Sequence, residues 1–196
     1  MRFLLGLTGS IGMGKSTTAQ MFREEGVPVW DADAAVHKLY AKGGRAVAAF
    51  AQHFPEVVVD GAVSRAVLKA GIASDRAMLA QIEAIVHPLV AEDRAAFIAD
   101  HADQLLVLDM PLLFETKADR WMDAVVVVTA APEVQKARVL QRETMTPGQL
   151  EMILAKQMPD AEKRARADYI IETVSMDAAR AAVQQIVREL KGKPDA

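Results

Sequence analysis

Short apolar runs alternate with longer amphipathic segments along most of the chain. The apolar runs, bounded by Gly, Pro or Asp, predict buried strands at residues 3–7, 27–30, 105–109, 124–129 and 169–171. Helical patterns follow at residues 17–25, 132–142 and 178–190. Strands that alternate with helices in this way predict a three-layer α/β fold, with a five-stranded parallel sheet between helices.

Residues 42–103 interrupt this alternation, and their pattern is mostly helical. Asp60-Gly61 marks a turn, and Ser74 is expected to cap a long helix. Pro88 should kink or restart that helix, because proline forfeits a backbone hydrogen bond. We therefore expect a helical insertion that covers a site on the main fold.

A second interruption precedes the last strand. Residues 146–149 fit a capping box with Pro147 at the first helical position, which predicts a helix to about Gln157. Two short helices within residues 143–166 could close over the site as a lid. The expected single domain thus has a core at 1–41, 104–142 and 167–191, an insertion at 42–103, a lid at 143–166 and a disordered tail at 192–196.

Composition narrows the class of protein. A chain of 196 residues suits one domain with an insertion. Its net charge of −3, with scattered basic residues, gives no footprint for nucleic acid. The absence of Cys excludes disulfides and thiol chemistry, and no apolar run approaches the roughly 20 residues of a membrane span. We expect a cytoplasmic protein, without nucleic-acid or membrane partners, that is a monomer or a weak homo-oligomer.

Residues 9–16 fit the pattern of a glycine, any four residues, then Gly-Lys-Ser, and lie between a strand and a helix as this motif requires. Gly12 and Gly14 let the backbone turn its N–H groups toward a polyphosphate. Lys15 would reach the β- and γ-phosphates, and the Ser16 hydroxyl would coordinate Mg²⁺. The predicted nucleotide-binding residues are Ile11, Gly12, Met13, Gly14, Lys15, Ser16 and Thr17.

Carboxylates follow two of the predicted strands. Because ligands lie off the carboxyl ends of strands in open α/β sheets, Asp31, Asp33 and Asp109 belong to the edge that carries the phosphate loop. Asp31 is explained equally well as a helix N-cap. Asp33 is the better candidate for a base that accepts the proton of an attacking hydroxyl. Asp109 could hold Mg²⁺ directly or through water, with a helix N-cap as the alternative.

Three polar residues share one face of the helix that starts at Pro132. Gln135, Arg138 and Arg142 are spaced by three and four. The opposite apolar seam consists of Val134, Ala137 and Leu140. The two arginines could neutralise charge on a phosphoryl group in transfer, although an ordinary surface face explains the spacing equally well.

Other positions carry weaker signals. His87 could contact a ligand, but a lone histidine is usually structural. Arg65 could anchor a phosphate, but is more often a solvated charge. Leu112, Leu113 and Phe114 follow a strand end and could pack against an adenine or a pantetheine arm, or could belong to the core.

Together these residues resemble one family over essentially the whole chain, the dephospho-coenzyme A kinases. The family's opening motif is similar to residues 7–17, and its Asp-x-Asp with a following His is similar to Asp31, Asp33 and His37. Further similar motifs are His87-Pro88, residues 111–115, Gln135 with Arg138 and Arg142, Gln157, and Ala167-Asp168.

The resemblance implies a P-loop kinase of the nucleoside-monophosphate-kinase type. Its reaction would transfer the γ-phosphate of ATP to the ribose 3′-hydroxyl of 3′-dephospho-coenzyme A, with Mg²⁺ as cofactor and Asp33 as the base. The insertion and Leu112 to Phe114 would hold the acceptor, and Arg142 would close with the lid. Two departures from the family pattern are Met13, in place of a frequent Ser, and Glu172-Thr173, in place of an asparagine-bearing turn. Since the loop binds through its backbone, Met13 is expected to be harmless.

Two other functions fit parts of the sequence. Residues 116–119 match the guanine-reading Thr-Lys-x-Asp pattern of GTP-dependent switches, but no Asp in the chain has Gly three positions later, as the switch requires. A noncatalytic nucleotide-binding module would bind nucleotide without acceptor-dependent release of ADP.

Overall fold

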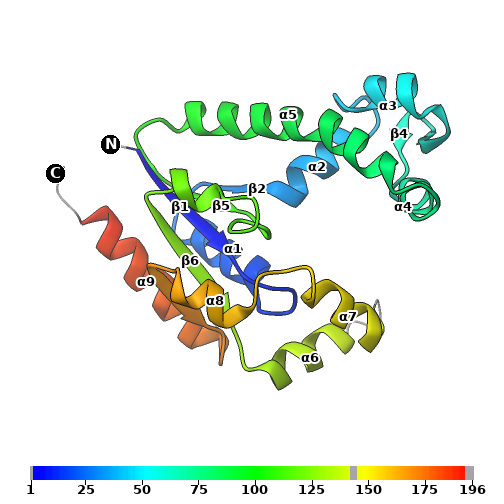
Figure 1. Ribbon diagram of the computed structural model, residues 1–196. Helices are drawn as coiled ribbons and strands as arrows, with labels where there is room; N and C mark the ends of the chain where they lie inside the picture. The colour runs from blue at the N-terminus through cyan, green and yellow to red at the C-terminus, as the bar shows by residue number, and fades with distance from the viewer. Residues whose placement is uncertain (1, 142–144, 193–196) are drawn as a thin grey trace. The chain divides into compact units, whose positions relative to one another are not determined.

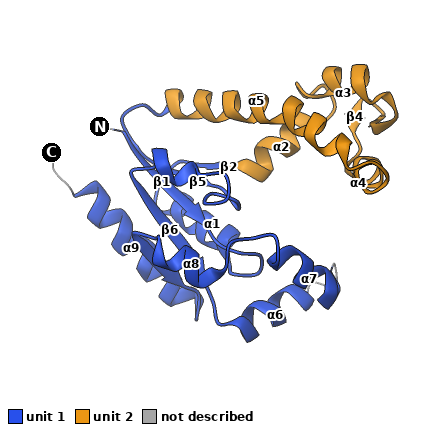
Figure 2. Cartoon of the chain, in the orientation of Figure 1, with its two compact units in different colours: residues 1–30, 101–196 blue, residues 31–100 orange. Residues whose placement is uncertain are grey.

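The computed structural model describes residues 2–141 and 145–192 (Figure 1). The chain forms two compact units, which are described separately (Figure 2). The first unit comprises Met1–Trp30 and His101–Ala196, and the second comprises Asp31–Asp100. The second unit therefore begins before the expected boundary at residue 42.

The first unit contains the five-stranded sheet that the sequence predicts. Its strands are β1 (Phe3–Thr8), β2 (Val29–Asp31), β5 (Leu105–Asp109), β6 (Ala124–Thr129) and β7 (Tyr169–Glu172), in the spatial order β2-β5-β1-β6-β7. Strand β1 pairs in parallel with β5 and β6, and β6 pairs in parallel with β7. The register places Leu7 of β1 beside Asp109 of β5. The parallel sheet is thus confirmed.

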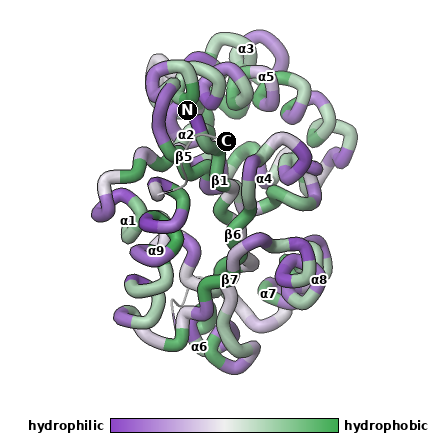
Figure 3. The backbone as a smooth tube through the Cα atoms, turned by 90° about the vertical axis from the view of Figure 1, so that its left-hand side faces the viewer, coloured by the Kyte–Doolittle hydropathy of each residue, from purple (hydrophilic) through white to green (hydrophobic). Residues whose placement is uncertain are grey.

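Both faces of this sheet are covered, and its strands follow the hydrophobic stretches of the chain (Figure 3). Along β6, Val126 and Val128 face a core shared with helices α1 (Lys15–Glu24) and α9 (Met176–Lys191). Val125 and Val127 alternate with them and belong to a second cluster on the other face. Helix α8 (Asp160–Ala165) packs against β6. The three layers are confirmed.

The remaining helices of the first unit are α6 (Pro132–Leu140), α7 (Pro147–Leu154) and the 3₁₀ helix η2 (Ala118–Trp121). Pro132 and Pro147 each open their helix as expected, and Thr146 and Gln149 form both hydrogen bonds of the capping box. Helix α7 ends earlier than the expected Gln157. The Ser175 hydroxyl accepts from Ala178 N–H at 3.1 Å and caps α9. The tail from residue 193 onward lies outside the described residues.

The second unit is mostly helical, as expected for the insertion. Its elements are α2 (Ala32–Tyr40), α3 (Val47–His53), η1 (Pro55–Val57), β3 (Val58–Val59), β4 (Ala62–Val63), α4 (Arg65–Ser74) and α5 (Ala77–Asp100). Tyr40, Phe50 and Val86 belong to its own apolar core. Helix α2 joins this unit because Leu39 and Tyr40 are buried in that core and Lys38 pairs with Asp93 of α5 at 3.0 Å.

Three details of the second unit differ from the sequence-based expectation. Ser74 does not cap α5: it is the last residue of α4, where its hydroxyl donates to Ala70 O, and Asp75 instead accepts from Ala77 N–H at 2.9 Å. Pro88 does not restart the helix, because α5 continues through it, and a kink at Pro88 stays a prediction. The packing of neighbouring residues such as Val86 against the core offsets the cost of the lost hydrogen bond.

The third difference is a missed hairpin. Strands β3 and β4 pair in antiparallel fashion around Asp60 and Gly61, which adopt φ values of 50° and 79°. Positive φ at both central residues is the geometry that Asp-Gly favours in a two-residue hairpin. The flanking strands have only two residues each, which is too short for an alternating pattern to show.

Candidate active site

The phosphate loop connects β1 to α1 and has the expected backbone geometry. Gly12 and Gly14 adopt φ values of 79° and 93°, in the left-handed region that favours glycine. A Cβ atom at Gly12 would lie 2.6 Å from Val139 Cγ2, so the loop also passes too close to α6 for a side chain there. Gly14 precedes α1, which starts at Lys15, two residues earlier than expected.

Lys15 and Asp109 form an ion pair at the carboxyl edge of the sheet. Asp109 is buried at the end of β5, and Lys15 is mostly buried at the first position of α1. The pair forms because β1, which leads into the loop, lies beside β5. Ser16 and Thr17 follow on the first turn of α1 and are exposed, while Ile11 and Gly12 are half-buried. The loop residues expected to bind nucleotide therefore lie together with Asp109.

The polar face of α6 packs inward, toward the phosphate loop. Gln135 is buried and donates from Nε2 to Ile11 O at 2.7 Å. On the opposite, apolar seam, Val134 and Ala137 are exposed and Leu140 is half-buried. The alternative that Arg138 lies on an ordinary surface face is wrong, because it is half-buried and hydrogen-bonded. The inward face of α6 is polar because it packs against loops whose backbone carbonyls have no partner within a helix or sheet. Those carbonyls need hydrogen-bond donors, which Gln135 and Arg138 supply.

Thr173 links three segments that are distant in sequence. Its hydroxyl accepts from Arg138 Nη1 at 2.7 Å and lies 2.9 Å from Met13 O, to which it donates. Its carbonyl accepts from Arg138 Nη2 at 2.8 Å. Through Thr173, α6 is attached both to the loop after β7 and to the phosphate loop. In the sequence, Thr173 differs from the family pattern, but no local signal indicates its role.

Met13 has a more specific environment than expected. Its side chain is buried, and its Sδ accepts from Ala130 N–H at 3.1 Å. The two departures from the family pattern are therefore in contact, since Thr173 bonds to the carbonyl of Met13.

A cavity of about 350 Å³ lies beside the phosphate loop within the first unit. Thr17 and Thr18 line one part of it, and Arg138, Thr173 and Ser175 line another. The full lining comprises Gly12, Gly14, Thr17, Thr18, Met21, Arg138, Thr173, Ser175, Met176 and Ala179. Its position next to the phosphate loop makes it suitable for the nucleoside part of a nucleotide.

Segment 112–114 divides between surface and core. Leu113 and Phe114 are buried in the cluster that contains Val125 and Val127, whereas Leu112 is exposed. The alternative that the sequence left open, a core role, therefore holds for Leu113 and Phe114. A ligand contact remains a prediction for Leu112 only.

Helix α8, in the segment expected to form the lid, is held by a buried ion pair. Lys163 is fully buried, and its Nζ lies 3.0 Å from Glu115 Oε1, which also accepts from Met158 N–H at 2.8 Å. Burial raises the pKa of the Glu115 carboxyl, but the Met158 N–H and the Lys163 ammonium lower it by more, so the pKa lies below its usual value. Closure of a lid remains a prediction.

The guanine-reading pattern at residues 116–119 has a structural role. Lys117 adopts a φ of 59° and precedes η2. Asp119 lies in the first turn of η2, where its carboxylate accepts from Arg166 Nη2 at 2.6 Å. The Asp119 carboxylate therefore binds Arg166 at the end of α8. The match of residues 116–119 to the guanine-reading pattern is thus explained by a structural role and no longer supports a GTP-dependent switch.

The other predicted site residues lie in the second unit or outside the described residues. The Asp31 side chain accepts from Ala34 N–H at 2.9 Å and caps α2, which confirms the N-cap alternative. Asp33 is exposed on the first turn of α2. Arg65 opens α4, with its guanidinium 5.9 Å from the centre of the Tyr40 ring, and His87 is exposed on α5. Arg142 lies outside the described residues.

The described part of the chain holds no cluster of three or more His, Asp or Glu that could bind a metal by itself. Among the same residues, no helix combines the length and apolar character needed to cross a membrane. A metal at this site would depend on Ser16, Asp109 and the oxygens of a bound nucleotide.

A phosphate loop at the carboxyl edge of a five-stranded parallel sheet, whose lysine is paired with the carboxylate at the end of the neighbouring strand, defines a P-loop nucleotide-binding protein. A family model described as Dephospho-CoA kinase matches residues 3–178. The dephospho-CoA kinase of Ruegeria pomeroyi is 61% identical over 191 residues, covering 97% of each chain. The chain belongs to the dephospho-CoA kinase family and is a kinase.

Solved structures agree with this fold. The crystal structure of a Thermus thermophilus protein is 30% identical, with a TM-score of 0.85 and 99% of each chain covered. A dephospho-CoA kinase from Campylobacter jejuni is 21% identical, with a TM-score of 0.69, covering 96% of this chain and 97% of that one.

Proposed function

We propose that this protein transfers the γ-phosphate of ATP to the ribose 3′-hydroxyl of 3′-dephospho-coenzyme A, giving coenzyme A and ADP, the last step of coenzyme A synthesis. Membership of the dephospho-CoA kinase family supports this acceptor. The single structural observation behind the proposal is the phosphate loop with its Lys15–Asp109 pair.

The phosphate loop binds the triphosphate of ATP through its backbone N–H groups, and Lys15 moves between Asp109 and the β- and γ-phosphates. The cavity lined by Thr17, Arg138 and Thr173 receives the nucleoside. Two hydrogen bonds to Thr173 hold the Arg138 guanidinium in place where it lines that cavity. The positive charges of Arg138 and Arg142 offset the negative charge on the phosphoryl group in transfer.

Ser16 and Asp109 fit a Mg²⁺ ion as donors, because one hydroxyl and one carboxylate oxygen leave the other positions of an octahedron to phosphates and water. The buried position of Asp109 beside Lys15 supports this assignment. When bound, Mg²⁺ neutralises charge on the phosphate oxygens.

Asp33 acts as the base. Its carboxylate takes the proton of the ribose 3′-hydroxyl while that oxygen forms a bond to the γ-phosphorus and the bond from this phosphorus to the oxygen of ADP breaks. The exposure of Asp33 on the first turn of α2 leaves the carboxylate accessible to an acceptor.

The second unit, with Arg65 and His87, and Leu112 of the first unit hold the acceptor. The exposure of all three side chains supports a role in binding. Of the expected lid at residues 143–166, the part that precedes the anchored helix α8 closes over the bound phosphates. We place the reaction in the cytoplasm and expect a monomer or a weak homo-oligomer.

A coupled assay of ADP release tests the proposal, with dephospho-coenzyme A, adenosine monophosphate and pantothenate offered separately. We expect turnover with dephospho-coenzyme A alone, and with ATP in preference to GTP. Activity confined to either other acceptor would show that the proposed acceptor is wrong. Nucleotide binding without acceptor-dependent turnover would indicate a noncatalytic module.

A further inference from the structure

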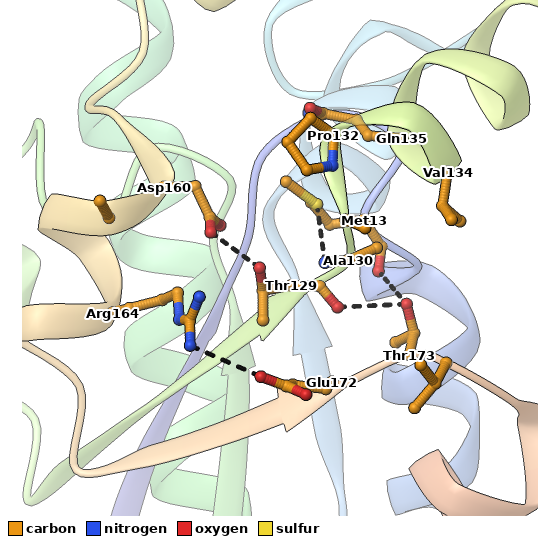
Figure 4. Close-up of a pocket in the computed structure, with 13 residues that line it drawn as sticks. Met13, Thr129, Ala130, Pro132, Val134, Gln135, Asp160, Arg164, Glu172 and Thr173 are labelled. Atoms are coloured by element: carbon orange, nitrogen blue, oxygen red, sulfur yellow. Dashed lines mark hydrogen bonds and ion pairs between the residues drawn. The ribbon is translucent and has the colours of Figure 1, made fainter.

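A second and larger cavity, of about 520 Å³, lies behind the phosphate loop within the first unit (Figure 4). Met13, Gln135 and Thr173 are among the residues that line it. Gln135 belongs to α6 and Thr173 follows β7, and both side chains reach backbone carbonyls of the loop. Because the cavity interrupts close packing behind the loop, hydrogen bonds contribute to fixing the backbone there.

Gln135 holds the peptide unit that joins Ile11 to Gly12. The side chain is buried, and its Nε2 donates to Ile11 O at 2.7 Å. No cis peptide bond occurs among the described residues, and the C=O and N–H groups of a trans peptide unit point in opposite directions. The Gly12 N–H therefore points away from Gln135.

Thr173 holds the peptide unit that joins Met13 to Gly14 (Figure 4). Its hydroxyl accepts from Arg138 Nη1 at 2.7 Å and lies 2.9 Å from Met13 O. Thr129 O is farther from this hydroxyl, at 3.3 Å, and already accepts from Thr173 N–H at 2.9 Å. The hydroxyl proton therefore goes to Met13 O, and the Gly14 N–H points away from Thr173.

The N–H groups of Gly12 and Gly14 are available to a ligand. No backbone carbonyl of the described residues accepts from either of them. The sheet order places β5, which ends in Asp109, and β7, which precedes Thr173, on opposite sides of β1. The two N–H groups are therefore aimed toward the side of the loop that carries the ion pair of Lys15 with Asp109.

We propose that Gln135 and Thr173 are positioning residues for the triphosphate of ATP, because they hold two carbonyls of the loop and so direct the Gly12 and Gly14 N–H groups at phosphate oxygens. This inference rests on the proposed function, which makes ATP the ligand of the loop. An N–H that points at an ionised oxygen forms a strong, charge-assisted hydrogen bond. A peptide unit turned the other way would instead present its carbonyl oxygen to that negative charge.

Calorimetric titration of inorganic tripolyphosphate into the full chain tests the loop without a nucleoside. Gln135→Met keeps the length of the side chain but removes its donor, and should raise the Kd about tenfold. Thr173→Val should raise it to a similar extent, whereas Thr173→Ser, which restores the hydroxyl, should rescue binding. Gln141→Met is the matched control, because it makes the same change as Gln135→Met at the exposed C-cap of α6.

The amide resonances of Gly12 and Gly14 show which peptide unit each side chain controls. In the parent, tripolyphosphate should shift both N–H proton resonances downfield, because each N–H then donates to an ionised oxygen. In Gln135→Met the shift should shrink at Gly12 and persist at Gly14, and in Thr173→Val the converse should hold. A role in stability alone would not distinguish the two glycines.

Three results would overturn the inference. They are a parental Kd for tripolyphosphate in both Gln135→Met and Thr173→Val, an equal loss of the Gly12 and Gly14 shifts in each variant, and no binding of tripolyphosphate by the parent. The thermal transition shows whether each variant folds. Since each variant is paired with its own glycine, either one alone decides whether its side chain positions the loop.

The proposed function is checked by a separate measurement on the parent, the release of ADP from ATP with dephospho-coenzyme A as acceptor. A parent that binds tripolyphosphate with both glycine shifts but releases no ADP would contradict the proposed acceptor and leave the positioning role intact. Acceptor-dependent release of ADP with unchanged tripolyphosphate binding in both variants would do the reverse.

Discussion

The two compact units of this chain differ in how their structure arises. In the first, strands such as β1 and β6 are almost wholly apolar and are buried on both faces. In the second, three helices of 7 to 10 residues and the 24-residue α5 surround a separate core, and the hairpin strands are two residues long. Runs of five or six apolar residues predict the central strands of the first unit from the sequence. The helix boundaries and turns of the second unit depend on caps and turns, and packing determines which residues make those hydrogen bonds.

The chemistry divides in the same way. The first unit contains the complete phosphate loop, with Lys15 and Asp109, and both cavities. The second contributes exposed single residues, among them Asp33 and His87. We therefore expect substitutions around the phosphate loop of the first unit to affect nucleotide binding or stability, and substitutions of exposed site residues in the second to affect acceptor binding or turnover.

The largest expected effect is that of Asp33→Asn. Loss of the proton acceptor should lower kcat by about 10²- to 10⁴-fold. The Kd of ATP should stay unchanged, because the phosphate loop is untouched. Steady-state kinetics and a nucleotide titration measure the two quantities.

Asp60→Asn is the matched control for Asp33→Asn. It makes the same chemical change within the second unit, at a hairpin position with a φ of 50°, which Asn tolerates. Its kcat should equal that of the parent. Parental turnover by Asp33→Asn would show that the base has been assigned wrongly.

Glu115→Ala should destabilise the first unit by about 3–5 kcal/mol, because it leaves the fully buried Lys163 without its carboxylate partner. Chemical denaturation measures the loss. The double variant Glu115→Leu with Lys163→Met should regain most of it, since neither charge then remains buried. A double variant as unstable as Glu115→Ala would mean that the charge itself is not the cause.

Acid should remove part of the same stabilisation. The pKa of Glu115 is lower in the folded protein than its usual value, so its contribution is fully present above the usual value and is lost as pH falls through the lowered one. We expect the parent to lose more stability over this acidic range than the double variant does. Equal losses in both proteins would contradict the role of Glu115.

Thr173→Val should raise the KM for ATP about tenfold, because Arg138 and the carbonyl of Met13 each lose a hydrogen-bond partner, at about 1–2 kcal/mol. Thr173→Ser keeps the hydroxyl and should behave like the parent. Initial-rate measurements at varied ATP compare the three proteins. Equal KM values for the Val and Ser variants would remove Thr173 from the nucleotide site.

The smallest effects are expected at helix caps. Asp31→Ala removes the cap of α2 in the second unit, and Ser175→Ala removes that of α9 in the first, each at about 1 kcal/mol. Amide hydrogen exchange should show weaker protection in the helix concerned and little change in the other. Equal loss of protection in both helices would mean that the two units open together.

Local sequence predicted the elements of the first unit because their signals lie within a few consecutive residues. The capping box at Thr146 and Gln149 spans four residues, and Pro132 opens its helix by the geometry of its own ring. Ser74 shows the limit of such signals, because its hydroxyl bonds back to Ala70 O and Asp75 takes the expected role.

The sequence by itself determined the phosphate loop of this kinase, since the geometry of its two left-handed glycines and the start of α1 is encoded in adjacent residues. Only the tertiary structure decided which face of α6 packs inward and gave Thr173 its role. Thr173 and Met13 are 160 residues apart, and no local pattern specifies a hydrogen bond across that separation. The cavity behind the loop has the same origin, because its walls come from segments that meet only when the sheet is assembled.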